Sequence, residues 1–182
     1  MKIKVLIAFL LGAVLAGTGW MHAQQKTALV ALTPQDDMEI RQLYAKYSWA
    51  TDVDKDDDGS KYASVFTADG EFRVSGRSSG LTGSAALAAS NRTRFVTLKK
   101  DGWESRHVIS NLVLEPVEGG VKGSAYATVF DVASRGYTRS NNPAGAKPPV
   151  VNHTGTYDDL LVKTRQGWRF KRRVFTLDAG SR

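Results

Sequence analysis

A chain of 182 residues without cysteine has no disulfides to rely on, so its stability must come from a packed core, and its length is typical of a single domain. The formal net charge of +7 favours anionic surfaces or substrates only weakly. The sequence has no phosphate-cradling G-x-x-x-x-G-K-[ST] loop and no H-E-x-x-H zinc helix, which argues against the nucleotide-dependent and zinc-dependent classes that use them.

The first 23 residues have the build of a secretory signal peptide. Two lysines precede an apolar segment, residues 5–17, that is shorter than the roughly 20 residues of a membrane span. Cleavage after Ala23 is expected, followed by a flexible leader over residues 24–32 and a domain over 33–178. The mature chain would then be periplasmic or secreted. An uncleaved anchor is the alternative, and it is the single membrane contact that the sequence indicates.

A long helix is predicted to begin at Thr33. Thr33 is a good N-cap, Pro34 suits the first helical position, and Asp36 and Asp37 place negative charge in the first turn. Residues at helical spacing carry the pattern to about Asp52: Ile40, Leu43, Tyr44, Tyr47 and Thr51.

The acidic segment at 54–59, DKDDDG, fits the opening of an EF-hand calcium loop. Such a loop needs a bidentate glutamate at its twelfth position, which is Val65 here. The segment is therefore predicted to be a hydrated turn, and no metal site is expected here or elsewhere in the chain.

The remaining pattern predicts an α+β domain with helices on one face of a curved sheet. A second short helix near residues 62–66 would be closed by TADG at 67–70, and a strand over EFRVSG and a third helix over 82–98 would follow. Alternating residues predict strands over 106–115, 121–132, 157–164 and 168–177, with turns at 118–120 and 165–167. Residues 134–154 are predicted to form a long loop.

The basic run WRFKRR at 168–173 has two interpretations. As a strand it places Trp168, Phe170 and Arg172 on one face and the other three basic residues on the opposite face. A half-buried strand with a basic solvent face is favoured over a nucleic-acid patch, so no nucleic-acid partner is expected. Because Arg172 shares a face with Trp168 and Phe170, an inward-pointing cation is one alternative for it.

The order of these elements resembles the SnoaL-like families of the nuclear-transport-factor-2-like superfamily. The resemblance covers roughly residues 32–177 and is carried by YSWATD (47–52), YASVFTADGEF (62–72), RHVISN (106–111) and GTYDDLLVKTRQGWRFKRR (155–173). It implies a cone-shaped, cystatin-like α+β fold in which three N-terminal helices close over a strongly curved, mainly antiparallel sheet around a deep apolar pocket. Members include scytalone dehydratase, bile-acid dehydratase, ketosteroid isomerase and polyketide cyclases, but also pure binding and assembly domains.

His107 is the first candidate catalytic residue. Period two in RHVISNLVLE places His107, Ile109, Asn111 and Val113 on one strand face, so His107 and Asn111 are predicted to enter a cavity together. Histidine exchanges protons near neutral pH, and the resemblance implies a pocket histidine in such a segment. The alternative is a core histidine bonded to a buried carbonyl. His153, in the predicted loop, is expected to be peripheral.

Asp52 and Tyr47 are the next candidates. The resemblance implies that an aspartate at this spacing orients the histidine and that the tyrosine hydroxyl binds a substrate oxygen. The alternatives are that Asp52 merely begins the hydrated turn, or that Asp54 takes its place. The aromatic residues are candidate pocket walls or ordinary core: Trp49, Phe66, Phe130 and Tyr157. Asp131 is the one possible counterpart of the base that ketosteroid isomerases use.

These residues give two functional hypotheses. The first is an exported dehydratase-like lyase or isomerase acting on a hydrophobic, oxygenated ring compound without a cofactor. His107 would move the proton, Asp52 would orient it, and Tyr47 and Asn111 would hold substrate oxygens. The second is a non-catalytic module of the same fold that binds a small apolar ligand or forms a homodimer or higher homo-oligomer.

Overall fold

The computed structural model describes residues 29, 31–53, 58–100, 102–133 and 149–179 of the chain. The predicted signal peptide, most of the predicted leader and acidic residues 54–57 lie outside these ranges, so export and the rejection of a calcium loop stay predictions. Within the described ranges, no helix is long and apolar enough to cross a membrane.

Helix α2 (Pro34–Asp52) begins and ends where the sequence predicts. The Thr33 hydroxyl accepts from the Asp36 backbone N–H, and the Asp36 carboxylate accepts from the Thr33 backbone N–H, which is a reciprocal capping box. Lys163 Nζ and Trp168 Nε1 also donate to Asp36, at 2.7 and 2.9 Å. The cap therefore ties the start of the helix to two residues that lie 127 and 132 positions later in the chain. The inward-facing residues are all buried: Ile40, Leu43, Tyr44 and Tyr47.

The second helix, α3 (Ser60–Ser64), passes directly into strand β1 (Phe66–Val74). The prediction that residues 67–70 form a closing turn is wrong, because they belong to β1. The pairing of β1 with its neighbour is irregular between Phe66 and Glu71, and Gly70 permits this because a Cβ there would lie 2.8 Å from the Phe66 side chain. A glycine marks a strand irregularity as readily as a turn.

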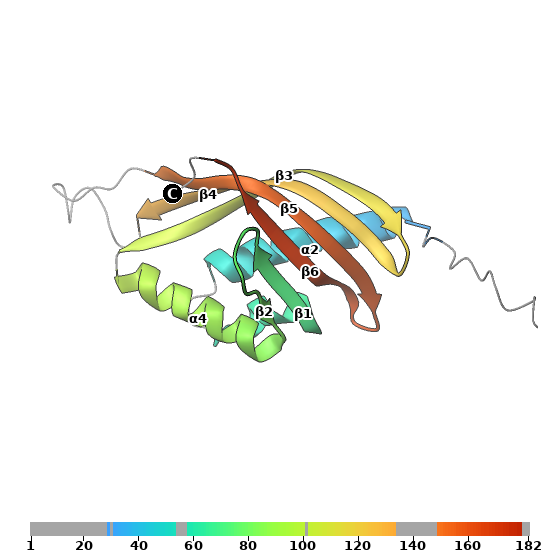
Figure 1. Cartoon of the computed structure of the whole chain (residues 1–182), viewed down its shortest axis with the longest axis horizontal. Helices are drawn as coiled ribbons and strands as arrows, with labels where there is room; N and C mark the ends of the chain where they lie inside the picture. Colours follow the sequence, from blue (N-terminus) through green and yellow to red (C-terminus); the bar gives the residue numbers. More distant parts are fainter. Residues whose placement is uncertain (1–28, 30, 54–57, 101, 134–148, 180–182) are drawn as a thin grey trace, which may run out of the picture.

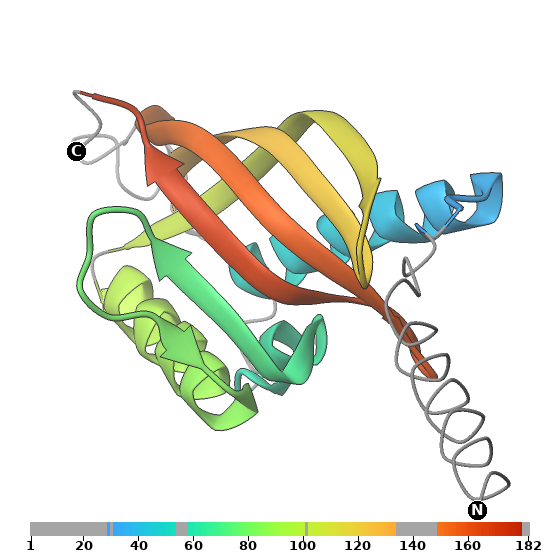
Figure 2. The same cartoon turned by 45° about the vertical axis from the view of Figure 1, so that its right-hand side comes forward.

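The strands form one six-stranded sheet in the order β2-β1-β6-β5-β4-β3. The other strands are β2 (Leu81–Thr82), β3 (Trp103–Val117), β4 (Gly120–Ala133), β5 (Val150–Thr164) and β6 (Gly167–Leu177). Neighbours are antiparallel except β1 and β6, which are parallel. Figure 1 and Figure 2 show the long strands bending around α2. The predicted α+β fold with a curved, mainly antiparallel sheet is confirmed.

The helices pack inside this curve. α2 contacts β3 and β6, and α4 (Ser84–Lys100) contacts α3, β1 and β3. The expected set of three N-terminal helices is not confirmed in that form, because β1 and β2 come before α4 in the chain. The space between α2, α4 and the sheet contains a cavity.

Strand β5 begins earlier than predicted. It starts at Val150 rather than Tyr157, and His153 pairs with Val129 of β4. Residues 150–154 of the predicted loop are therefore strand, and residues 134–148 lie outside the described part of the chain. The consecutive β-branched residues Val150 and Val151 were the available strand signal.

A bulge in β3 changes which side chains face the core. The pairing of β3 with β4 shifts between Ser110 and Val113, and Asn111 has a φ of 55° in the left-handed region. An extra residue reverses the inward and outward alternation beyond it. Leu112 and Leu114 therefore pack against the core in place of Asn111 and Val113.

A second bulge lies in β6. Phe170 and Arg172 of β6 pair with consecutive residues of β5, so Lys171 has no opposite residue. Arg172 is exposed as a result, whereas Arg173 is 0% exposed. The predicted two faces of the WRFKRR strand hold only up to this bulge.

Candidate functional site

A cavity of about 350 Å³ lies between α2, α4 and the curved sheet. This volume is in the range of small-molecule pockets. Its inner wall is aromatic and buried, whereas its edge is formed partly by the exposed Arg77 and Leu177. The buried aromatic residues of the lining are Tyr47, Tyr62, Tyr157 and Phe175.

The end of α2 beside this cavity is held by α4. Asn91 Nδ2 donates to the Ala50 carbonyl at 3.2 Å, and Arg94 Nη1 donates to the Thr51 carbonyl at 2.7 Å. These bonds satisfy carbonyls that a helix end leaves without partners, and the Arg94 charge complements the negative end of the helix dipole. Arg94 Nη2 also lies 4.0 Å from Asp52 Oδ1, which offsets the cost of a carboxylate at this end.

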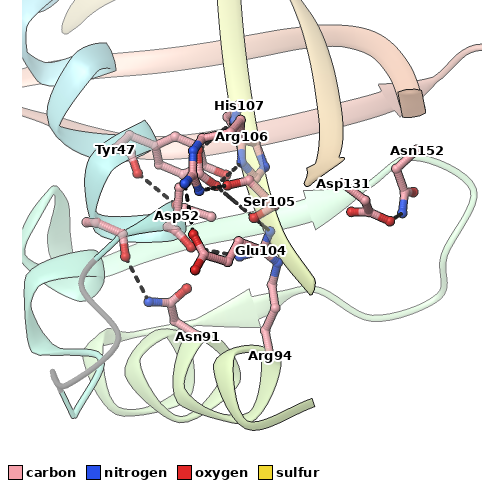
Figure 3. Close-up of polar contacts among 12 residues, drawn as sticks. Tyr47, Asp52, Asn91, Arg94, Glu104, Ser105, Arg106, His107, Asp131 and Asn152 are labelled. Carbon is pink, nitrogen blue, oxygen red and sulfur yellow. Dashed lines mark hydrogen bonds and ion pairs between the residues drawn. The ribbon is translucent and has the colours of Figure 1, made fainter. Parts of the chain in front are cut away.

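Asp52 and His107 form a buried pair at this point (Figure 3). Asp52 Oδ1 lies 2.6 Å from His107 Nδ1, and Asp52 Oδ2 accepts from the His107 backbone N–H at 2.6 Å. Ser105 Oγ donates to Oδ1 at 2.8 Å. The side chains of His107 and Asp52 are 7% and 5% exposed, and His107 lines the cavity. The structure thus brings the two residues together across 55 positions of sequence.

These contacts decide the charge states of the pair. Burial has the largest influence on Asp52 and opposes its charge, but the hydrogen bonds from His107 and Ser105 outweigh it, so the pKa of Asp52 lies below its ordinary 3.8. Burial also dominates at His107 and lowers its pKa below the ordinary 6.5, although Asp52 opposes that shift. At neutral pH a charged carboxylate therefore accepts from Nδ1–H of a neutral imidazole. Nε2 is left as the basic nitrogen.

Tyrosine hydroxyls gather beside the pair. The hydroxyls of Tyr47 and Tyr157 lie 3.5 Å apart, and the Tyr47 ring meets the His107 ring edge-on at 6.2 Å between centroids. Burial is the main reason that the pKa values of Tyr62 and Tyr157 lie well above the ordinary 10.0. The Tyr62 and Tyr157 hydroxyls therefore stay protonated and can donate hydrogen bonds to an oxygen of a ligand.

A buried cation lies behind the tyrosines, at a position that the sequence pattern did not reveal. Arg173 is 0% exposed and donates from Nε and Nη2 to Asp159 at 2.9 and 2.7 Å. Its guanidinium carbon is 4.1 Å from the ring centroids of both Tyr47 and Tyr157. The alternative in which Arg172 points inward is not what the structure has, because the bulge in β6 turns the next residue inward instead.

His153 lines the same cavity, so its predicted peripheral place in a loop is wrong. Its Nδ1 lies 2.7 Å from Asn152 Oδ1, and Asn152 Nδ2 donates to Asp131 Oδ2 at 2.5 Å. Burial lowers the pKa of His153, the electrostatic interactions with His107 and Arg94 lower it further, and Asp131 opposes the shift. The hydrogen-bond chain from Asp131 to this histidine runs through the Asn152 amide. In the described part of the chain, no group of three or more His, Cys, Asp or Glu residues could hold a metal ion.

The predicted substrate-binding residues divide into two sets. Tyr47 and Tyr157 line the cavity, but Asn111, Trp49 and Phe130 do not. Asn111 leaves the strand face of His107 because of the bulge in β3, and Trp49 is 63% exposed on α2; both border a separate groove between α2 and β3. Phe130 follows the buried Val129 and falls outside the cavity lining. Their assignment to the cavity wall is wrong. Phe66, the other aromatic candidate, lies in the core.

Replacing Asp52 by asparagine should destabilise the fold by about 1–3 kcal/mol, measured by urea denaturation. Both Asp52 oxygens accept hydrogen bonds, whereas an amide has one acceptor oxygen, so a buried donor loses its partner. The carboxylate also raises the pKa of His107, and its loss should move the NMR titration of His107 to lower pH. A higher His107 pKa in this variant would contradict the pairing. Asp37→Asn, which removes an exposed partner of Arg41, is the matched control.

Solved structures share this fold. Aln2 from a Streptomyces species is 28% identical over 80% of this chain and 93% of its own, with a TM-score of 0.64. An NTF2-like protein with a cystatin-like fold from Novosphingobium aromaticivorans is 25% identical over 81% of this chain and 84% of its own, with a TM-score of 0.60. ActVI-ORFA from Streptomyces coelicolor is 22% identical over 78% and 96%, with a TM-score of 0.63, a likeness that concerns the fold alone.

Sequence comparison identifies the family. No curated protein is significantly similar to the chain. The profile of the SnoaL-like domain, however, matches residues 33–174, from the N-cap of α2 to the middle of β6. The match spans the elements that position Asp52, His107 and the cavity tyrosines. The chain therefore belongs to the SnoaL-like domain family.

Proposed function

We propose that this protein is a cofactor-independent dehydratase or isomerase that acts on a hydrophobic, oxygenated ring compound. The observation that carries the proposal is the 2.6 Å contact between Asp52 Oδ1 and Nδ1 of His107, a histidine that lines a largely aromatic cavity. His107 is the general base. Asp52 holds its tautomer and stabilises the imidazolium that forms when His107 takes up a proton.

The reaction begins at a carbon next to a carbonyl group of the substrate. Nε2 of His107 takes the proton from this carbon, and the C–H electron pair forms an enolate. The enolate oxygen accepts hydrogen bonds from the hydroxyls of Tyr47 and Tyr157, which lie 3.5 Å apart. Preorganised donors in a site shielded from water stabilise such developing charge more strongly than water does.

The second half of the reaction returns the proton. In a dehydration the enolate re-forms its carbonyl, a new carbon–carbon double bond forms, and the C–O bond to a β-hydroxyl breaks. The His107 imidazolium gives its proton to the leaving oxygen, so that water departs. In an isomerisation the imidazolium gives the proton to another carbon. Both reactions are redox-neutral, so the proposal requires neither an oxidant nor a reductant.

A ligand screen with product analysis tests the proposal. Purified protein is first screened by thermal shift against steroid-like and aromatic polyketide-like compounds, because a bound ligand stabilises the folded state. Compounds that raise the melting temperature are then incubated with the protein and examined by mass spectrometry for loss of water and by chromatography for isomers. We expect at least one to be converted. Ligands that stabilise the protein but are recovered unchanged would contradict the proposed enzymatic function and favour a non-catalytic binding module.

A further inference from the structure

Apart from the tyrosines, the charged and titratable side chains that line the cavity are all basic. They are Arg77, Arg94, His107 and His153, and no Asp or Glu of the described residues is among the lining residues. Asp52 lies behind His107 and is bonded to it. The lining therefore offers positive charge to a ligand without an acidic group to repel an anion.

The two lining arginines differ in how they are engaged. Arg94 is half-buried and donates to the Thr51 carbonyl and to Ser105 Oγ, so its charge is used within the fold. Arg77 is exposed, and its side chain has no hydrogen bond or ion pair among the described residues. Arg77 is thus a cation at the cavity edge that is available to a ligand.

The turn between β1 and β2 holds Arg77 at this place. The Ser75 backbone N–H donates to the Phe175 carbonyl at 2.8 Å, and the Arg77 backbone N–H donates to the Val74 carbonyl at 3.1 Å. Val74 and Phe175 both line the cavity. The turn is therefore anchored to the cavity wall, and these bonds fix the position of the Arg77 backbone next to the cavity.

Arg73, in strand β1 before the same turn, differs from Arg77 in its ion pairing. Its guanidinium pairs with Glu71, and it does not line the cavity. One arginine of this hairpin is neutralised within the protein, whereas the other is presented at the cavity without a counter-charge among the described residues. The cavity consequently has two chemically different ends, tyrosine hydroxyls inside and, at the edge, a guanidinium that no described side chain engages.

We propose that Arg77 binds a carboxylate of the substrate, so that the substrate is a compact organic acid whose oxygenated ring enters first. This inference rests on the proposed function, because it names the substrate class of the same site. The ring oxygen lies against Tyr47 and Tyr157, and the carboxylate stays at the exposed edge, where its hydration is largely retained. An arginine matches a carboxylate with two parallel N–H···O bonds.

The test compares a carboxylate with its neutral amide on the same ring. Binding of 2-naphthoate and 2-naphthamide to the purified protein is measured by isothermal titration calorimetry. The protein should prefer naphthoate by at least about threefold, the scale of a partly exposed charge pair. Arg77→Gln should remove this preference and leave naphthamide affinity unchanged. Arg73→Gln, the matched control, should keep it.

The inference is overturned by equal affinity for the two probes, by a preference that survives Arg77→Gln, or by no naphthoate binding at millimolar concentration. Equal losses in Arg77→Gln and Arg73→Gln also overturn it, because they indicate a general effect of charge. Neither probe has a proton on a carbon next to its carbonyl, so binding is measured apart from turnover. A naphthoate preference in a protein that converts no compound would leave this inference standing and overturn the proposed function instead.

Discussion

Replacing His107 by glutamine should lower kcat/KM of the proposed reaction by about 10²–10⁴-fold, the usual contribution of a general acid or base. Glutamine has no nitrogen that titrates near neutral pH, so the proton has no acceptor. The fold should persist, because the bond to Asp52 Oδ2 comes from the backbone N–H of residue 107 and does not depend on the side chain. Steady-state kinetics and thermal melts of the same preparation measure the two effects.

Chemical rescue separates a lost proton carrier from a disturbed cavity. His107→Ala leaves a space beside Asp52 in which free imidazole can take the place of the missing ring. Added imidazole should restore part of the activity of His107→Ala and have no effect on His107→Gln, where the space is filled. If neither variant loses activity, His107 is a core histidine and the proposed mechanism fails.

The pH dependence gives a second signature of the same base. The pKa of His107 lies below 6.5 because of burial, so the neutral form persists into mildly acidic solution. In the unsubstituted protein, kcat/KM should therefore fall only below pH 6.5, as protonation removes the base. This acidic limb should be absent from the residual activity of His107→Gln.

The pairing with Asp52 adds a test of coupling. Asp52→Asn should cost less activity than His107→Gln, because the base itself remains. The double variant should cost less than the sum of the two single losses, since residues that act as one unit are not additive. Additive losses would mean that Asp52 contributes to activity by another route than through His107.

Features with a local cause were predictable from the sequence. The start of α2 is set by Thr33, Pro34 and Asp36, which lie within four positions and satisfy the helix end by themselves. The end of α2 at Asp52 followed from the same helical spacing. The family resemblance added the link between Asp52 and His107, which no local pattern contains, because they lie 55 positions apart.

The errors have one main physical cause, which is that this sheet is irregular. Period two assigns faces correctly only along an unbroken strand, and one extra residue reverses every assignment beyond it. For this reason Asn111 does not line the cavity and Arg172 does not face the core. Neither bulge has a glycine at the extra residue, so the usual sequence mark of a bulge is absent. The bulges are part of how long strands bend around α2.

Replacing Arg173 by methionine should destabilise the protein by about 3–5 kcal/mol, the usual cost of leaving one member of a buried ion pair alone. Asp159, its partner, is 3% exposed and keeps only the Tyr44 hydroxyl, at 2.5 Å, as a donor among the described side chains once the guanidinium is gone. The chain is shaped around this contact, since a Cβ at Gly123 would lie 2.3 Å from the Tyr44 hydroxyl. Urea denaturation measures the loss.

The double variant Arg173→Met, Asp159→Leu should recover much of this loss, because no lone charge then remains buried and apolar side chains of similar size can replace such a pair at little net cost. Recovery should be partial. The guanidinium also contacts the rings of Tyr44 and Phe170, at 4.7 and 3.9 Å from their centroids, and these cation–π contacts disappear with the charge. Its Nη1 has no hydrogen-bond partner among the described residues, so both variants are relieved of the desolvation cost of that nitrogen.

Lys171→Met, which removes an exposed partner of Asp69 on the same strand as Arg173, should change stability by no more than about 1 kcal/mol. If Arg173→Met costs no more than this control, the buried pair does not hold the inner wall of the cavity in place.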